Sequence, residues 1–381
     1  MGKVEKIGII THYHGSLNYG GVLQAYALCK YLNQNFACSE QINYDYLGDL
    51  HSNVNNSLNL SKRVIIQLKK SIRSLLKNDE DKKLMIRKNK FNVFREEIPH
   101  TRKTYSAKTI KKLSDRYDYC IVGSDQVWNP EWFCEPFFLT FTSKKVKRIS
   151  YAASLGKQAL TENQKTLYTS LLFDFDYISV REKSAAKILG ELTDKTIDTL
   201  LDPTLLLEKN EWDLITPKRI ISDNYVFCYF LSKDIYLREL AKSFAESKSL
   251  ALVFLMHADG YCKNDLDVPC IKIYDAGPLE FLSLIKNAKY ILTDSFHASV
   301  FSCIFERQFF VFGRTDKPGM SERLLELASL FKIDKHIIAS ELPNKESYMN
   351  ECDDIAYEKQ NDMLAQRRRD SKLFLNKAIN V

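Results

Sequence analysis

The stretch Ile291-Leu292-Thr293-Asp294-Ser295-Phe296-His297 decides the expected fold, together with Ala298–Phe305 after it. Lys289 to Thr293 has the apolar character of a short strand, and Ser299 to Phe305 has the spacing of a buried helix. This arrangement places Ser295, Phe296 and His297 between a strand's carboxyl end and a helix's amino end, where open α/β sheets bind anions. A histidine there can carry a proton near neutral pH. Taken alone, the stretch fits a capping serine followed by a packed histidine as well.

Length and composition indicate a globular protein of two domains. With 381 residues the chain is too long for one ordinary core. Its 45% hydrophobic and 27% charged residues exclude disorder, and no apolar run approaches the ~20 residues of a membrane-spanning helix. The nine cysteines are odd in number and never in C-x-x-C spacing. We therefore expect reduced thiols and a cytoplasmic location.

The positive charge of the chain is concentrated in one segment. Eleven Lys or Arg stand against three acids between Ser61 and Lys90, whereas the whole chain carries only +7. The remainder is close to neutral, which argues against a nucleic-acid partner. A basic amphipathic helix at Ser61–Glu97 could lie on the inner face of an anionic membrane. A solvated helix that packs on its own domain is the alternative.

The amino-terminal region has the order strand, glycine-containing loop, helix. Ile7 to Thr11 is a buried-type strand, His12 to Gly21 is rich in turn residues, and Val22 to Leu32 has helical apolar spacing. Backbone N–H groups in such a loop can surround a phosphate or carboxylate. The loop is neither G-x-G-x-x-G nor a P-loop, so nucleotide-binding readings lose support. A tight turn without a ligand fits the same residues.

Polar residues follow three further predicted strands. Asp118–Val122 leads into Gly123-Ser124-Asp125-Gln126-Val127-Trp128-Asn129-Pro130, and Arg148–Ser150 leads into a small-residue loop that contains Ser154. Arg181 stands at the exit of Tyr177–Val180, where a guanidinium could bind a phosphate or carboxylate. A turn beside a core tryptophan and a surface arginine that caps the next helix are the structural alternatives.

No metal site is predicted. Asp174-Phe175-Asp176 resembles the Asp-x-Asp of metal-dependent glycosyltransferases, but it precedes a strand instead of following one. The pair His12 and His14 has no third ligand at a recognisable spacing.

Two series of alternating strands and helices predict an α/β fold with two Rossmann-like domains of parallel sheet that face a cleft. The first would span residues 1–205, with the basic helical insert at about 55–100, and the second residues 206–350. Residues 351–381 would form a carboxy-terminal helix that could pack back across both domains.

Taken together, these motifs resemble the polysaccharide pyruvyl transferase family over most of the chain. The matching stretches are Asn18–Ala27, Ile121–Pro130, Ser150–Ser154, Ser179–Glu182, Leu201–Thr204 and Thr293–His297. They supply the substrate-binding candidates Asn18, Gly20, Gly21, Ser124, Asp125, Gln126, Trp128, Asn129, Ser154, Asp294, Ser295 and Phe296. Each stretch is weak alone, and their shared order carries the resemblance.

The resemblance implies a GT-B-like fold and a metal-independent reaction without a cofactor. A pyruvyl group would move from phosphoenolpyruvate to two hydroxyls of a glycan acceptor, which could be lipid-linked, in surface-polysaccharide synthesis. It also implies that Arg181 binds the donor and that His297 is the histidine beside the donor's phosphate and reactive carbon. Ser295 stands where some members carry an arginine, and Ala298 stands where glycine is frequent. Donor binding must then depend on Arg181, the helix amino terminus or another cation.

Two other functions stay open at this point. One is a GT-B-like glycosyltransferase that uses a nucleotide sugar, and the other is a non-catalytic family member that has lost the chemistry. The acceptor sugar and the oligomeric state do not follow from the sequence.

Overall fold

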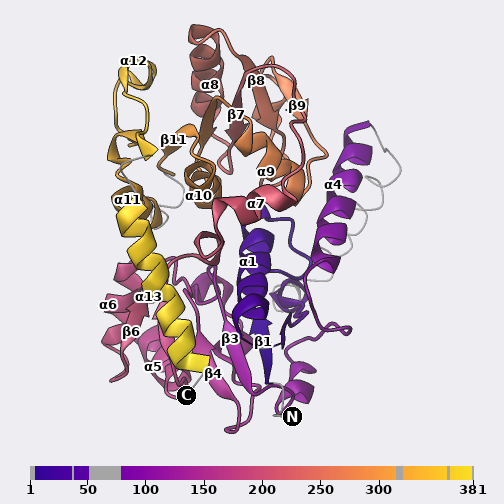
Figure 1. Ribbon diagram of the computed structural model, residues 1–381, viewed down its shortest axis with the longest axis vertical. Coiled ribbons are helices and arrows are strands. Elements are labelled where there is room, and N and C mark those ends of the chain that lie inside the picture. The colour runs from indigo at the N-terminus through magenta and orange to yellow at the C-terminus, as the bar shows by residue number, and fades with distance from the viewer. Residues whose placement is uncertain (1–4, 37, 51–78, 315–320, 358–360, 380–381) are drawn as a thin grey trace, which may run out of the picture. The chain divides into compact units, whose positions relative to one another are not determined.

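The computed structural model describes residues 5–36, 38–50, 79–314, 321–357 and 361–379 (Figure 1). The chain divides into two compact units. The first comprises Met1–Leu17, Gly21–Pro203 and Asn376–Val381, and the second comprises Asn18–Gly20 and Thr204–Leu375. Each is described by itself below, and the predicted cleft stays a prediction.

The first unit is built on a parallel sheet with the strand order β2-β1-β3-β4. Its strands are β1 (Lys6–Ile10), β2 (Cys38–Gln41), β3 (Tyr119–Val122) and β4 (Lys147–Ser150), with the parallel pair β5 (Ile178–Val180) and β6 (Ile197–Thr199). The bridges Ile149–Tyr177 and Ala153–Val180 connect β5 to the end of β4. Because Ile7–Ile10 of β1 and all of β3 are apolar and buried, these strands suit the centre of a covered parallel sheet.

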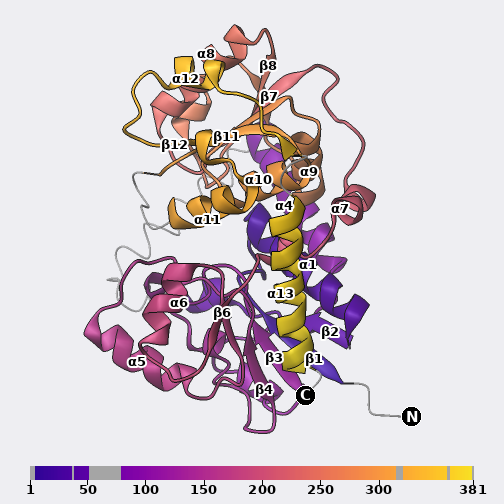
Figure 2. The ribbon, with the colours of Figure 1, turned by 60° about the vertical axis from the view of Figure 1, so that its left-hand side comes forward.

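The helices of this unit are α1 (Tyr19–Asn35), which begins on residues of the second unit, α4 (Asp79–Glu96), α5 (Glu162–Leu172) and α6 (Lys183–Gly190). Figure 2 shows α5 and α6 beside β6. The capping box of Thr161 and Gln164 explains the sharp start of α5. Of the predicted basic helix, the part from Asp79 onward is helical, and residues 61–78 lie outside the described part of the chain.

The second unit contains a six-stranded parallel sheet with the order β12-β11-β10-β7-β8-β9. Its strands are β7 (Tyr225–Tyr229), β8 (Ala251–Leu255), β9 (Ile271–Ile273), β10 (Tyr290–Thr293), β11 (Gln308–Phe312) and β12 (Ile337–Ile338). Its helices are α7 (Lys209–Ile215), α8 (Ile235–Ser247), α9 (Pro278–Lys286), α10 (Phe296–Ile304), α11 (Ser321–Phe331), α12 (Lys345–Glu351) and most of α13 (Asn361–Ile379).

Both faces of this sheet are covered. Val226 and Cys228 of β7 join the apolar cluster that contains Phe244 of α8, whereas Phe227 and Tyr229 contact the ring of Phe281 in α9. The alternation follows from the two-residue period of a strand. Helices on both faces explain why the strands are continuously apolar and confirm the α/β class predicted from them.

Three predicted boundaries are wrong. α1 begins at Tyr19, so Gly20 and Gly21 lie in a helix and not in a loop. α10 begins at Phe296, three residues before the predicted start, because Ser295 is its N-cap.

The last predicted helix begins only at Asn361. The side-chain amide of Gln308 accepts a hydrogen bond from the Ile355 N–H at 2.7 Å and donates one to its carbonyl at 3.2 Å. These two bonds hold the chain around Ile355 outside a helix. Within the described ranges, no helix combines the length and the apolar character needed to cross a membrane.

Candidate functional site

Each unit has its own topological switch point. This is the position in a parallel sheet where the chain, after adding strands on one side of the first strand, returns to add strands on its other side. In the second unit β7 pairs with β8 on one side and with β10 on the other. The chain runs from β7 through β8 to β9 and then returns to β10. Ligands of open α/β sheets bind at the carboxyl ends of the two strands that flank such a point. Here those ends are followed by Phe230–Ser232 and by Asp294–His297.

Asp294 holds these two strand ends together. One of its carboxylate oxygens accepts the N–H of Leu231 at 2.6 Å, and the other accepts the N–H of Ser232 at 2.7 Å. Thr293 reinforces the junction, since its hydroxyl donates to the Tyr229 carbonyl at 2.6 Å. The carboxylate of Asp294 therefore positions the loop after β7, and its predicted substrate contact stays a prediction.

Ser295, Phe296 and His297 form the start of α10. The Ser295 hydroxyl accepts the Ala298 N–H at 3.4 Å, so the serine that replaces the family arginine caps the helix. Phe296 and His297 occupy the first turn, where the helix dipole and the N–H groups favour an anion. The imidazole of His297 is 8% exposed and meets the ring of Phe296 edge-on at 5.2 Å.

Gly20 lies directly against His297. A β-carbon on Gly20 would stand 2.0 Å from the Nδ1 atom of His297. The preceding residue fixes this approach, because the Tyr19 hydroxyl donates to the Ala276 carbonyl at 2.7 Å and its ring stacks on Phe281 at 4.6 Å. The structure thus brings Gly20 to His297 within the second unit. It also explains why a glycine occupies position 20, since any side chain there would overlap the ring of His297. Of its predicted neighbours, Asn18 is exposed and Gly21 is buried.

Arg323 is a residue that the sequence analysis missed. Its guanidinium lies over the ring of Phe296 at 5.5 Å, and its side chain is 4% exposed. Cation–π contact and burial place a positive charge beside the first turn of α10. Because Ser295 stands where some family members carry an arginine, the sequence analysis expected donor binding to depend on Arg181, the helix amino terminus or another cation. Arg323 is such a cation, and its contact with a donor stays a prediction. The only sequence signal was its position at the start of a helix after β11, which many surface arginines share.

In the first unit Arg181 is buried among carboxylates. Its Nη1 atom lies 2.7 Å from Asp202 and its Nε atom 3.5 Å from Glu182. Burial by itself would lower the pKa of Arg181, but the charges of Glu182, Asp202 and Asp125 outweigh it and raise that pKa. Arg181 therefore compensates two buried acids. Since it belongs to the first unit and His297 to the second, their joint action on one donor stays a prediction.

Further predicted residues of the first unit surround this ion pair. The Ser154 hydroxyl donates to Glu182 at 2.5 Å, and the Ser124 hydroxyl donates to the Ala152 carbonyl at 2.7 Å. Asp125 has a left-handed backbone with φ of 69° and accepts the N–H of Gln126 at 2.9 Å. The structure therefore brings Ser124, Asp125, Ser154 and Arg181 to one edge of the sheet.

Two of the candidates have a clear structural function. The ring of Trp128 is fully buried against Phe138, and its indole N–H donates to the Phe137 carbonyl at 3.0 Å. Asn129 caps a short 3-10 helix (Pro130–Trp132) by accepting the Glu131 N–H at 2.9 Å, and it donates to Gln126. Substrate contact by these residues stays a prediction.

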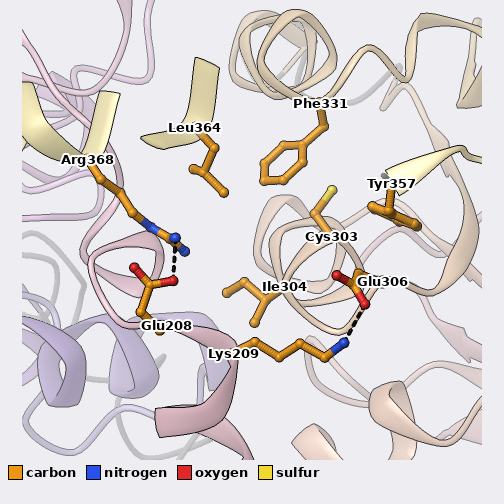
Figure 3. A pocket seen from close by; sticks show the side chains of 9 residues that line it. All are labelled: Glu208, Lys209, Cys303, Ile304, Glu306, Phe331, Tyr357, Leu364 and Arg368. Atoms are coloured by element: carbon orange, nitrogen blue, oxygen red, sulfur yellow. Dashed lines mark hydrogen bonds and ion pairs between the residues drawn. The ribbon is translucent and has the colours of Figure 1, made fainter. Parts of the chain in front are cut away.

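A separate small cavity of about 120 Å³ lies at the carboxyl end of α10 (Figure 3). Ile304, Phe331 and Leu364 line it, and the ion pairs Lys209–Glu306 and Arg368–Glu208 stand at its margin. Both cations are matched by acids, so the cavity offers no net charge to a phosphorylated ligand. Among the described residues no group of three metal-ligating side chains is arranged to hold an ion.

Comparison with solved structures identifies the fold. The chain is similar to the UDP-GlcNAc 2-epimerase from Methanocaldococcus jannaschii with a TM-score of 0.55 and 14% identity, over 97% of this chain and 99% of that one. The same enzyme in complex with UDP-GlcNAc and UDP gives 0.53 and 13%, over 97% and 99%. A Listeria monocytogenes structure assigned as a UDP-N-acetylglucosamine 2-epimerase gives 0.53 and 12%, over 100% and 98%. At these identities the likeness shows the fold alone, and it confirms the predicted GT-B-like class of two Rossmann-like halves.

The family is then fixed by sequence. The family model described as polysaccharide pyruvyl transferase matches residues 18–316. The match therefore includes Tyr19 and Gly20 and extends past α10. The chain belongs to the polysaccharide pyruvyl transferase family, which confirms the resemblance and makes it a transferase of polysaccharide biosynthesis. The search of curated proteins finds no match to this chain.

Proposed function

We propose that the protein transfers a pyruvyl group from phosphoenolpyruvate to two hydroxyls of a sugar in a surface-polysaccharide precursor, without metal or cofactor. The observation that carries the proposal is the place of His297. In a chain of this family, that imidazole stands in the first turn of a helix at the switch point of the second unit. A proton donor and an anion-binding helix terminus side by side suit an enol phosphate.

The proposed chemistry balances as follows. His297 as imidazolium donates a proton to the methylene carbon, and the first sugar hydroxyl forms a bond to the adjacent carbon while it loses its proton to a base. The bond between that carbon and the phosphate oxygen then breaks. The second hydroxyl closes the ketal, and its proton leaves with the phosphate. General acid catalysis of this kind contributes ~10²–10⁴-fold.

Positive charge must stabilise the phosphate as it departs. The first turn of α10 and the guanidinium of Arg323, which lies over Phe296, supply it in the second unit. The sequence-based prediction that Arg181 also holds the donor is retained as part of the proposal. The transfer would take place in the cytoplasm, and residues 61–90 would contact the inner face of the membrane.

The test begins with ligand binding. Phosphoenolpyruvate should raise the melting temperature of the protein, whereas UDP and GDP should not. Stabilisation by UDP or GDP alone would favour the nucleotide-sugar glycosyltransferase instead. With phosphoenolpyruvate and candidate glycans, including lipid-linked ones, phosphate release should require both substrates. His297→Gln should lower that rate by ~10²–10⁴-fold while phosphoenolpyruvate still binds.

A further inference from the structure

The first unit has a switch point of its own, which the donor chemistry of His297 does not use. β1 pairs with β2 on one side and with β3 on the other. The chain returns from β2 to β3, so the carboxyl ends of β1 and β3 flank the switch point. The residues that follow these ends are Thr11 and His12 after β1, and Gly123 to Asp125 after β3.

A buried hydrogen-bond network fixes the two strand ends relative to each other. The Thr11 hydroxyl donates to the Ser124 carbonyl at 2.8 Å and accepts from the Gln24 amide at 3.0 Å. The same Gln24 side chain accepts the Ser124 N–H at 3.1 Å. His12 and Asp125 follow Thr11 and Ser124 directly, so this network positions both residues at the same edge of the sheet.

His12 is enclosed by aromatic rings. Its imidazole is 6% exposed and lies 4.6 Å from the ring of Tyr46 and 4.8 Å, edge-on, from that of Phe137. Its Nε2 atom is buried and has no hydrogen-bond partner among the described residues. Buried polar atoms are nearly always paired, so an unpaired one in a rigid setting points to a ligand that completes it.

The protonation of this ring suits a base. Burial lowers the pKa of His12, and the charge of Asp125 opposes part of that shift. The ring is therefore neutral near pH 7, and the adjacent carboxylate stabilises the imidazolium once a proton is taken up. A neutral imidazole beside a carboxylate accepts a proton from a hydroxyl group readily.

The carboxylates of this edge favour a neutral ligand that donates hydrogen bonds. The carboxylates of Asp125, Glu182 and Asp202 outnumber the guanidinium of Arg181 that they surround. Sugar hydroxyls are neutral and donate hydrogen bonds to carboxylates.

Trp132 adds a flat apolar surface to this edge. Its side chain is 36% exposed, and its ring centroid lies 6.5 Å from that of His12. An exposed indole near an imidazole, at an edge that also carries a carboxylate, combines apolar area with a few polar groups, as small-molecule sites do. The apolar face of a pyranose ring matches the indole, and its hydroxyls match the polar pair.

We propose that His12, Asp125 and Trp132 form a sugar-binding site in the first unit, with Trp132 as its platform and His12 as the base that takes the proton of the attacking hydroxyl. This inference rests on the proposed function for the role of the base, but not for the sugar site. In the reaction the hydroxyl proton passes to the imidazole of His12 as the oxygen bonds to the donor carbon. The proton that His297 is proposed to donate to the methylene carbon is a different one.

The experiment measures sugar binding without any donor. Saturation-transfer NMR on the full chain would use the methyl glycosides of galactose, glucose, mannose and N-acetylglucosamine as probes. We expect transfer to at least one glycoside in the wild type, its loss in Trp132→Ala, and weaker transfer in His12→Gln. His14→Gln is the matched control, because His14 lies two residues away and its ring contacts the Thr104 hydroxyl instead; it should bind as the wild type does.

Turnover then separates the two claims. With the glycoside that binds as acceptor, His12→Gln should lower phosphate release by ~10²–10⁴-fold and leave phosphoenolpyruvate binding unchanged. The sugar site is refuted if the wild type binds none of the four glycosides, or if Trp132→Ala binds as well as the wild type. If His12→Gln releases phosphate at the wild-type rate, the role of His12 as the base is refuted. Sugar binding that needs Trp132, without any use of phosphoenolpyruvate by the wild type, would refute the proposed function and the role of the base, and leave the sugar site standing. Because Trp132 is exposed, its variant tests the site even if His12→Gln fails to fold.

Discussion

Replacing Gly20 by alanine should disable His297 without touching it chemically. The new β-carbon would stand 2.0 Å from Nδ1, 2.3 Å from Cγ and 2.7 Å from Cε1 of the ring, whereas ordinary contact begins at 3.4 Å. The ring must therefore move by about 1.4 Å, the difference between 3.4 and 2.0 Å. A displacement of ~1 Å at a catalytic group can cost ~10²-fold in rate.

The backbone itself accepts the change. Gly20 lies within α1, where alanine is favoured over glycine by ~0.5–1 kcal/mol. Overpacking against His297 costs ~1–3 kcal/mol in the opposite direction. The net loss of unfolding free energy should thus be small, while turnover falls by ~10²-fold.

The assay is phosphate release with phosphoenolpyruvate and acceptor, with urea unfolding measured in parallel. Gly190→Ala is the matched control, since a β-carbon there meets no atom within 4 Å. In a His297→Ala background, Gly20→Ala should cost no further activity, because the ring that it displaces is gone. Activity of Gly20→Ala within a few-fold of the wild type, or an additive loss in the double variant, would refute the reasoning.

Three further predictions concern the charges around the two switch points. Asp294→Asn should lower the free energy of unfolding by ~1.5–3 kcal/mol in urea titrations, because an amide can no longer accept both backbone N–H groups; an unchanged midpoint would contradict this. Arg181→Gln should lower the melting temperature, since Asp202 and Glu182 lose their buried counter-charge. A raised KM for phosphoenolpyruvate at unchanged stability would instead show that Arg181 only binds the donor. Burial lowers the pKa of His12, as it does for the other two histidines whose pKa is lowered, so the unfolded chain binds more protons below about pH 6.5. The contribution of these histidines to the free energy of unfolding is therefore fully present above that pH and is lost as the pH falls through their folded pKa values. We expect the urea midpoint to be lower at about pH 5.5 than at about pH 7.5, and an unchanged midpoint would exclude this effect.

The sequence by itself determined the fold class and the local context of His297. Apolar runs and helical spacings are local properties, so β10 follows from them. The order of six short motifs identifies the family. Apolar spacing alone places the start of α10 three residues late, because the hydroxyl of Ser295 caps the helix before its first apolar-periodic residue.

Only the tertiary structure decided which side chains meet. Gly20 and His297 are far apart in the chain, and nothing in either motif required that the glycine leave room for the ring. The same holds for Arg323 over Phe296 and for His12 and Asp125 at one edge of the first sheet, since parallel strands bring distant strand ends to one edge. Periodicity encodes which face a residue occupies, but the partner on that face depends on strand order, and strand order is a property of the assembled sheet.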